Sequence, residues 1–170
     1  VAIPMYNAAS TISNTLGSAL RQSYENLDIV VIDDGSTDDC GGLVRAFDDR
    51  RVRYHRQDNS GVAEARNRGL DLARGTYVAF LDADDIWASN HVETLVEAVG
   101  RYPQAGLLAN RYVEVPPDDS KRMREVDGGG AAKIHQVPDF VARWARGEAQ
   151  IHTSTSMVRL KVSPGGRRAK

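Results

Sequence analysis

The sequence predicts an α/β fold in which helices cover both faces of a mostly parallel sheet. Apolar runs typical of buried strands start near residues 1, 27, 52, 76 and 105, a spacing of about 25 residues. Amphipathic helical patterns lie between most of these runs, as in βαβ units, whose strands are parallel. The runs are apolar nearly throughout, as expected of strands that are covered on both faces.

The first two strand-to-helix units can be traced in order. Residues 1–3 are predicted to end a buried strand, because Pro4 lacks the backbone donor that would continue its ladder. In 10–22 the apolar side chains recur at helical spacing, which predicts a helix. A second apolar strand over 27–32 leads into 33–38, a carboxylate pair in a glycine turn whose Ser, Thr and Asp side chains can cap the next helix.

The same rhythm continues to residue 115. After a helix that carries Leu43, Val44 and Phe47, the predicted elements are a strand over 52–57, a helix over 62–73, a strand over 76–82, a helix over 90–100 and a strand over 105–115. The regularity then ends, because 116–132 is too polar and glycine-rich to pack and is predicted to be a mobile loop. A short amphipathic helix from Pro138 and a strand within 151–162 complete the prediction.

Composition narrows the class of protein. The 170 residues are 41% hydrophobic and 26% charged with a net charge of -1, so we expect one globular core and no nucleic-acid partner. The single cysteine, Cys40, excludes an internal disulfide and a thiolate metal cluster and is expected to be buried or half-buried. No apolar run approaches the roughly 20 residues of a transmembrane helix, and no signal peptide precedes the first strand. Because the chain starts inside a strand pattern without an initiator methionine, we expect a fragment truncated at both ends.

Three carboxylates follow the fourth predicted strand, at Asp82, Asp84 and Asp85. If the chain is still extended there, Asp82 and Asp84 point to one face with their Cα atoms roughly 6.5 Å apart. Two like charges at that distance oppose folding unless a cation or a set of donors compensates them. A divalent metal that carries a diphosphate meets this need, because magnesium binds one or two carboxylates together with phosphate oxygens. The alternative is an acidic loop that caps the next helix.

Further polar side chains are predicted at the same edge of the sheet, outside the carboxyl ends of the strands, where ligands of parallel α/β proteins bind. They are residues 4–7, Asp33 with Asp34, and Arg66 with Asn67 at the opening of a neighbouring helix. A ring that stacks on a base, carboxylates for base or ribose donors and an arginine for phosphate charge suit a nucleotide diphosphate. The chain contains neither a G-x-G-x-x-G nor a G-K-[ST] loop, which disfavours dinucleotide-binding and P-loop proteins.

Four stretches carry a resemblance to a known family: VAIPMYN, VVIDDGSTD, NSGVAEARNRG and GTYVAFLDADDIW. In this order they resemble the family-2 glycosyltransferases with the GT-A fold, a Rossmann-like nucleotide-diphospho-sugar transferase fold. The resemblance makes 1–115 the nucleotide-sugar-binding half of the domain and 116–170, with its loop at 116–132, the incomplete start of the acceptor-side half. It implies inverting, metal-dependent transfer of a sugar from a nucleotide diphosphate donor to the hydroxyl of a glycan, lipid or other acceptor, as in the synthesis of cell envelope polysaccharide.

The resemblance assigns nucleotide binding first to side chains that follow the first two strands. Pro4 and Tyr6 would line the base pocket, with Asn7 in the same loop. Asp34 would accept a hydrogen bond from the base, and Asp33 would support the turn.

The other two motifs carry the remaining assignments. Arg66 would face the nucleotide or its diphosphate, and Asn67 would fix the start of their helix. Asp82 would approach the ribose or the metal, and Asp84 would bind Mg²⁺ or Mn²⁺ bridging the diphosphate. Asp85 would either contribute to this site or cap the following helix.

Inverting transfer also needs a general base, which the resemblance places on an Asp or Glu in the second half of the domain. After Ala132 the acids are Asp139 and Glu148, and neither lies in a convincing motif. The catalytic base is therefore expected beyond Lys170. Family members work in the cytoplasm or at the inner face of the membrane.

Other interpretations remain open. A nucleotidyltransferase would carry an early glycine-rich, basic loop, which VAIPMYNAAS lacks, whereas a non-catalytic nucleotide-sugar binding module is compatible with a truncated chain. The four histidines lack metal-ligand spacing and are expected in structural positions; they are His55, His91, His135 and His152. His152 is the exception to check, because its neighbours could reach the acceptor side. Trp87 either stacks on a sugar or packs beneath the acidic loop.

Overall fold

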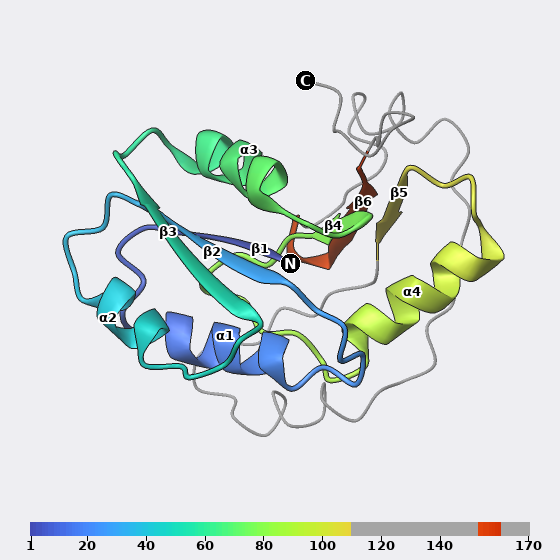
Figure 1. Cartoon of the computed structure of the whole chain (residues 1–170), viewed down its shortest axis with the longest axis horizontal. Coiled ribbons are helices and arrows are strands. Elements are labelled where there is room, and N and C mark those ends of the chain that lie inside the picture. The colour runs from blue at the N-terminus through green and yellow to red at the C-terminus, as the bar shows by residue number, and fades with distance from the viewer. Residues whose placement is uncertain (110–152, 161–170) are drawn as a thin grey trace.

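The computed structural model of the chain describes residues 1–109 and 153–160 and has the predicted α/β architecture (Figure 1). Two three-stranded sheets have the strand orders β1-β2-β3 and β4-β6-β5. The strands are β1 Ala2–Met5, β2 Ile29–Asp34, β3 Val52–Gln57, β4 Tyr77–Ala79, β5 Leu107–Ala109 and β6 Ser156–Arg159. The first sheet is parallel, whereas β6 runs antiparallel to both β4 and β5. A parallel bridge between Ala2 and Phe80 joins the two sheets.

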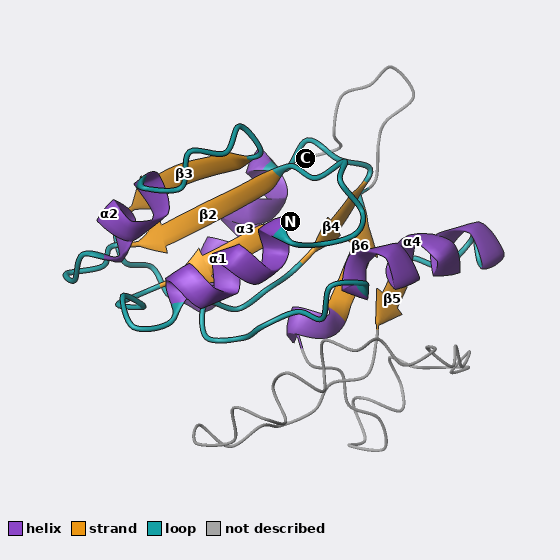
Figure 2. Ribbon diagram, turned by 90° about the horizontal axis from the view of Figure 1, so that it is seen from below, coloured by secondary structure: helices purple, strands orange, loops and turns teal. Residues whose placement is uncertain are grey.

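Helices cover both faces of the parallel sheet, as predicted (Figures 1 and 2). The helices α1 Ile12–Leu20 and α2 Cys40–Arg45 lie on one face, and α3 Val62–Leu72 lies on the other. Helix α4 His91–Arg101 lies beside β5 of the second sheet, and the short 3₁₀ helix η1 spans Thr153–Thr155. Side chains alternate along a strand, so neighbouring residues enter different cores. Ile3 and Val31 pack with α1 and α2, while Ala2, Val30 and Ile32 pack beneath α3.

Pro4 does not end the first strand, so that prediction is wrong. It lies within β1 and is in register with Ile32 of β2. The carbonyl of Val1 accepts a hydrogen bond from Val30, whereas the carbonyl of Ala2 accepts one from the backbone N–H of Leu81 on the other side. Because backbone groups alternate between the two sides, the nitrogen of Pro4 lies on the same side as that of Ala2, and its missing donor leaves the β1–β2 ladder intact.

The second strand extends farther than its apolar run. Asp33 and Asp34 belong to β2 and are in register with Arg56 and Gln57 of β3. The pairing keeps both acidic residues extended and holds their backbone within the ladder. The carboxylate pair therefore lies at the end of a strand and not in a free loop.

The fourth strand is shorter than predicted. It ends at Ala79, and the carbonyl of Asp82 accepts a hydrogen bond from the backbone N–H of Asp85 at 3.1 Å, which closes a turn. The extended arrangement expected for Asp82 and Asp84 is therefore wrong. The turn bends the chain away from the sheet at the point where its polar residues begin.

The remaining elements in the described part of the chain agree with the prediction, except that α2 ends at Arg45, so Phe47 lies beyond the helix that was predicted to carry it. β3 spans the predicted 52–57, and α1, α3 and α4 lie within two residues of their predicted bounds. β5 begins inside the predicted 105–115, and β6 lies inside 151–162. The loop at 116–132, the helix from Pro138, His135 and His152 lie outside the described residues. In the part of the chain that the structure describes, no helix has the length and apolar character needed to cross a membrane.

Candidate functional site

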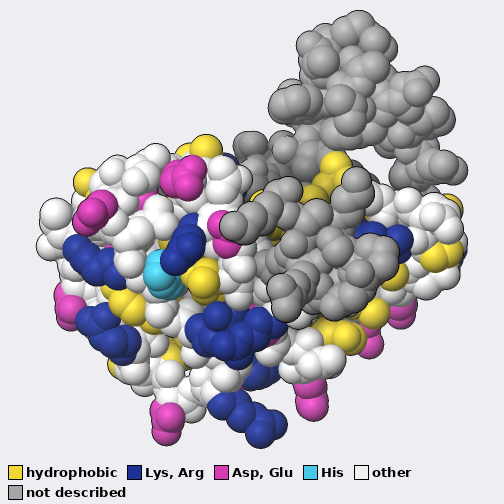
Figure 3. Space-filling model, turned by 45° about the horizontal axis from the view of Figure 1, so that its top comes forward, with side chains coloured by type: hydrophobic (Ala, Val, Ile, Leu, Met, Phe, Trp, Pro, Cys, Tyr) yellow, Lys and Arg dark blue, Asp and Glu magenta, His cyan; other side chains and the backbone are white. Residues whose placement is uncertain are grey.

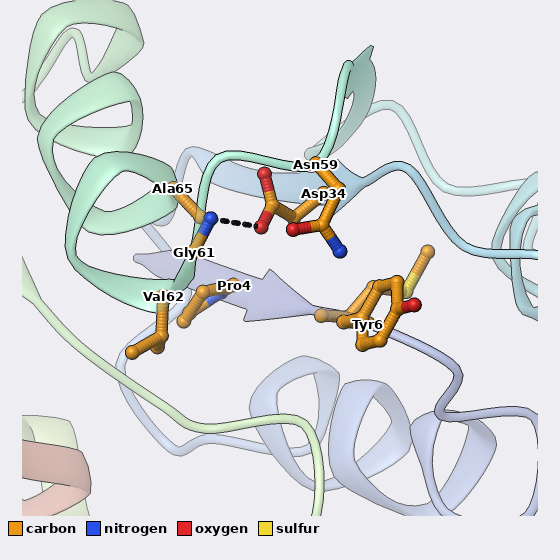
Figure 4. Close-up of a pocket in the computed structure, with 8 residues that line it drawn as sticks. Pro4, Tyr6, Asp34, Asn59, Gly61, Val62 and Ala65 are labelled. Carbon is orange, nitrogen blue, oxygen red and sulfur yellow. Dashed lines mark hydrogen bonds between the residues drawn. The ribbon is translucent and has the colours of Figure 1, made fainter.

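A pocket opens at the carboxyl ends of β1 and β2, the edge at which the site was expected (Figure 4). Its volume is about 300 Å³. It is lined by Pro4, Met5, Tyr6, Asp34, Asn59, Gly61, Val62 and Ala65. The walls thus come from β1, from the end of β2 and from the β3–α3 connection, which are far apart in the sequence.

Asp34 provides the carboxylate of this pocket, and neighbouring groups hold it in one orientation. Its Oδ1 accepts hydrogen bonds from Gln57 Nε2 at 2.8 Å and from the backbone N–H of Ser60 at 3.0 Å. Its Oδ2 accepts one from the backbone N–H of Gly61 at 2.8 Å, as Figure 4 shows. A carboxylate has about four acceptor positions, so the described contacts leave one at Oδ2. Asp34 is suited to accept a hydrogen bond from a ligand without reorientation.

Apolar side chains flank this carboxylate and reach solvent. Tyr6 is 52% exposed and Val62 is 54% exposed, although both line the pocket. Large apolar side chains at the rim of a cavity offer flat contact area to a planar ring. The pocket therefore combines a surface for stacking with one fixed hydrogen-bond acceptor.

Asp33 supports the turn after β2 and is fully buried. It accepts hydrogen bonds from the backbone N–H of Ser36 at 2.8 Å, from the hydroxyl of Tyr54 and from Arg56 Nη1 at 2.8 Å. Burial opposes its ionisation, but the hydrogen bonds from Ser36 and Tyr54 prevail and lower the pKa of Asp33 below its usual range. The bond from Ser36 joins Asp33 to the turn that follows β2.

Asn7 links the loops that follow β1 and β2. Its backbone φ is 50°, in the left-handed region that asparagine tolerates better than most residues. Its Oδ1 accepts a hydrogen bond from the backbone N–H of Thr37 at 2.7 Å, and its own N–H donates to Ser36 Oγ at 3.0 Å. Asn7 thus fixes one loop against the other beside the pocket.

Arg66 and Asp82, predicted separately as nucleotide-binding residues, contact each other. Arg66 Nη2 lies 2.8 Å from Oδ1 and 3.0 Å from Oδ2 of Asp82. Arg66 Nε is buried and has no hydrogen-bond partner among the described residues. The arginine neutralises one of the three carboxylates of the acidic turn and keeps an unused donor.

The position of α3 corrects the expectation for Asn67. The helix begins at Val62 after Gly61, which adopts a φ of 88°, so Arg66 and Asn67 lie within the helix and not at its start. Asn67 is exposed and does not cap the helix. The helix predicted over 62–73 has the observed start, so only the expectation that Asn67 fixes this start is wrong.

Asp84 and Asp85 occupy different positions in the acidic turn. Asp84 is exposed, and no described residue pairs with its carboxylate. The N-cap of α4 is Asn90, so the expectation that Asp85 caps this helix is wrong, because five residues separate the two positions. Asp84 is thus the carboxylate of the turn that is open to a ligand.

The residues present fit a metal that is completed by its ligand. Among 1–109 and 153–160 there is no group of three His, Cys, Asp or Glu side chains that could hold a metal. Magnesium binds through one or two carboxylates when phosphate oxygens and water supply the other ligands. Asp84 provides one open carboxylate, and Asp82 provides a second that it shares with Arg66.

The two aromatic candidates next to the turn have structural positions. Trp87 is 4% exposed and stacks on His91, with ring centroids 4.5 Å apart. Burial lowers the pKa of His91 to about 4, so its ring is neutral near pH 7. The packing alternative for Trp87 is confirmed, as is the structural position of His91.

Arginine side chains gather on the face that carries α3, next to a histidine (Figure 3). Arg68 of α3 donates a hydrogen bond from its Nε to His55 Nε2 of β3 at 3.2 Å. Arg53 pairs with Asp28 at 2.7 Å. Part of this positive charge is therefore neutralised within the chain.

Sequence reasoning did not find the residues that orient the site. Gln57 and the amides of Ser60 and Gly61 hold Asp34, and Ser154 Oγ accepts a hydrogen bond from the backbone N–H of Asp82 at 2.8 Å. Gln57 could have been found from its place at the end of a strand beside Asp34. No pattern in the sequence indicates the contact of Ser154, which lies 72 residues away.

Together the fold and the site define an α/β protein with a ligand pocket at the carboxyl ends of its parallel strands. Residues 1–158 match the family described as Glycosyl transferase family 2. Because this match covers more than half of the chain, the chain belongs to glycosyl transferase family 2 and carries a glycosyltransferase domain.

Two named relatives illustrate the similarity in sequence. The chain is 40% identical over 114 residues to Glycosyltransferase GlyA of Streptococcus pneumoniae serotype 4. The matched region covers 66% of this chain and 16% of GlyA. It is 35% identical over 115 residues to UDP-Glc:alpha-D-GlcNAc-diphosphoundecaprenol beta-1,3-glucosyltransferase WfaP of Escherichia coli, which covers 67% of this chain and 46% of WfaP. The chain thus matches less than half of the length of either relative.

Two solved structures have a similar fold. TarS 1–349 of S. aureus in complex with UDP has a TM-score of 0.64 and 25% sequence identity, with 68% of this chain and 36% of TarS 1–349 covered. The mannosyltransferase PcManGT from Pyrobaculum calidifontis, in complex with GDP-Man and Mn2+, has a TM-score of 0.66 and 25% identity, with 92% of this chain and 43% of PcManGT covered. Both neighbours bind nucleotides.

Proposed function

We propose that this chain forms the donor-binding part of a metal-dependent, inverting glycosyltransferase that moves a sugar from a nucleotide diphosphate to an acceptor hydroxyl. The observation that carries the proposal is the pairing of a pocket around Asp34 with an acidic turn that exposes Asp84, in a chain of family 2. A nucleotide diphosphate would place its base in the pocket and its diphosphate beside the acidic turn.

The pocket favours bases that present a ring N–H. Both oxygens of Asp34 accept hydrogen bonds from N–H donors, so this side chain matches uracil, thymine or guanine, which carry a ring N–H, better than cytosine, which presents an unprotonated nitrogen there. Tyr6 and Pro4 supply the contact surface for the base. The UDP of the TarS structure and the GDP-Man of the PcManGT structure both contain a base of this kind.

The acidic turn would hold the diphosphate through a divalent metal. Asp84 is the proposed Mg²⁺ or Mn²⁺ ligand, with Asp82 as the partner that faces the ribose or the metal. Bound there, the metal would stabilise the negative charge of the leaving diphosphate. Arg66 and Asn67 are proposed to contact the nucleotide from α3.

The acceptor and its activation are also part of the proposal. WfaP is named for transfer to a sugar linked to diphosphoundecaprenol, so we include a lipid-linked acceptor at the inner membrane face, besides other glycan hydroxyls. The general base is placed outside the described residues, because the described acids at this edge already have other partners or assigned roles.

Calorimetry on this chain tests donor binding, with UDP and GDP compared against CDP in the presence of Mn²⁺. We expect UDP or GDP to bind more tightly than CDP, and equal or absent binding of all three contradicts the proposed pocket.

Turnover is tested in the complete protein with Asp84→Ala, which should lower the metal-dependent rate by about a hundredfold or more because a preorganised electrostatic partner is lost. Asp48→Ala, an exposed acid between α2 and β3, is the matched control. Donor binding by the complete protein without turnover would favour a binding module.

A further inference from the structure

We propose that three buried hydroxyl side chains are positioning residues that hold the acidic turn in the shape that binds the metal and diphosphate. These residues are Thr15, Ser18 and Ser154, and we call them the hydroxyl clamp. The inference rests on the proposed function of the turn. It adds residues that contact the backbone of the turn, or of Trp87 just after it, and that need no contact with the donor.

Two members of the clamp come from α1. Thr15 is 1% exposed, and its Oγ1 donates a hydrogen bond to the carbonyl of Ala83 at 2.8 Å. Ser18 is also 1% exposed, and its Oγ accepts a hydrogen bond from the backbone N–H of Trp87 at 3.1 Å. The same Oγ donates to the backbone carbonyl of Thr15 at 2.7 Å, which fixes the Ser18 hydroxyl on α1. Both are far in sequence from the turn that they hold.

The third member comes from the distant segment that ends in β6. Ser154 is 3% exposed, and its Oγ accepts a hydrogen bond from the backbone N–H of Asp82 at 2.8 Å. Its carbonyl accepts one from Trp87 Nε1. The adjoining contact between the N–H of Phe80 and the carbonyl of Ser156, at 3.2 Å, keeps this segment beside the chain that leads into the turn.

The clamp acts on backbone that has little other support. β4 ends at Ala79, and within the turn the described backbone bond joins the N–H of Asp85 to the carbonyl of Asp82. Ser154 holds the backbone N–H of Asp82, and Thr15 holds the carbonyl of the next residue, Ala83. Asp84, which follows them, stays exposed. Buried polar groups that lose their partner are costly, so the turn would shift if a clamp hydroxyl were removed.

A preformed turn should bind a metal more tightly than a loose one. A ligand site that must be ordered on binding loses affinity by the cost of ordering, and the nearby carboxylates repel one another when no cation is present. The clamp therefore affects the metal step more than base binding, because Asp34 is held by a separate set of donors on the β3–α3 connection. This difference separates positioning from general structural support.

The test is Mn²⁺ binding to this chain with saturating UDP or GDP, measured by electron paramagnetic resonance. Thr15→Val keeps the shape of the side chain and removes its donor, and we expect Mn²⁺ affinity to fall by about tenfold. Thr15→Ser keeps the hydroxyl and should restore the affinity. Metal-free nucleotide binding should stay unchanged in both variants. Thr94→Val is the matched control, because it removes a hydroxyl that donates to the carbonyl of Asn90 on α4 at 2.9 Å.

Several results would overturn the inference. Wild-type Mn²⁺ affinity in Thr15→Val would do so, as would an equal loss in Thr94→Val or an equal loss of metal-free nucleotide binding. If Thr15→Val does not fold, Ser154→Ala replaces it, since it removes the acceptor for Asp82 and leaves the carbonyl contact of Ser154 in place. If the wild-type chain binds nucleotide but does not bind Mn²⁺, the metal site and the clamp are both rejected. If it binds no nucleotide, the proposed function itself is rejected.

Discussion

Asp34→Asn is the substitution that most directly tests the proposed base pocket. The two side chains have the same shape, and Asp34 is only 2% exposed, so the change alters hydrogen bonding and charge in a nearly closed environment. The Asn side chain can keep its oxygen toward Gln57 and Ser60. Its amide nitrogen then replaces Oδ2 and faces the N–H of Gly61, which donated to Oδ2 at 2.8 Å.

The magnitudes follow from these contacts. A hydrogen bond to a charged group contributes about 1.5 to 3 kcal/mol, so loss of the Gly61 bond should lower the free energy of unfolding by about 2 kcal/mol. A base N–H that pairs with Oδ2 would lose a bond of the same kind. Converted at about 1.4 kcal/mol per factor of ten, this loss weakens UDP or GDP binding by about 10- to 100-fold. CDP, whose ring nitrogen is an acceptor, should instead gain relative to UDP.

Calorimetry at a temperature at which the variant is folded gives the affinities, and urea unfolding gives the stability. Asp48→Asn, at an exposed acid between α2 and β3, controls for the change in net charge. Unchanged UDP and GDP affinities in Asp34→Asn, with the ratio of UDP to CDP binding also unchanged, would refute the assignment of Asp34 to the base. Equal losses of affinity for UDP, GDP and CDP would show that the substitution disturbed the pocket and that the Asp34 carboxylate does not distinguish the bases.

The remaining predictions concern stability. Burial lowers the pKa of His91 from 6.5 to about 4, so between these two pH values the unfolded chain binds more protons than the folded chain. The free energy of unfolding should therefore fall by up to about 3 kcal/mol as the pH drops through this window. Urea unfolding at several pH values should show a shallower fall for His91→Phe, and identical pH profiles of the two proteins would contradict the reasoning. Gly69→Ala should destabilise the fold by about 1 to 3 kcal/mol through overpacking, because its Cβ would lie 2.8 Å from Ala2 Cβ and 3.1 Å from Ile32 Cδ1. Gly100→Ala meets no atom within 4 Å and should be neutral or stabilising, so equal effects of the two glycine substitutions in thermal melts would count against the packing argument.

Local patterns were sufficient to predict the alternation of strands and helices. Apolar runs and helical periodicity depend on residues close in sequence, and these set the parallel sheet with α1, α3 and α4 near their observed bounds. Strand ends were less predictable, since they depend on neighbouring strands. β2 reaches Asp34 because β3 pairs with it there, and Pro4 stays in β1 because its nitrogen faces away from β2.

The sequence by itself determined the fold class, the family resemblance and the acids and cations that lie at one edge of the sheet. The tertiary structure decided how these groups are paired. It placed Arg66 against Asp82, bent the acidic turn so that Asp84 is exposed, and brought Ser154 next to the turn from 72 residues away. Such contacts depend on side-chain geometry between segments distant in the chain, and no local periodicity records them. The acidic motif therefore identified the residues of the candidate metal site, while packing determined which of its carboxylates is open to a ligand.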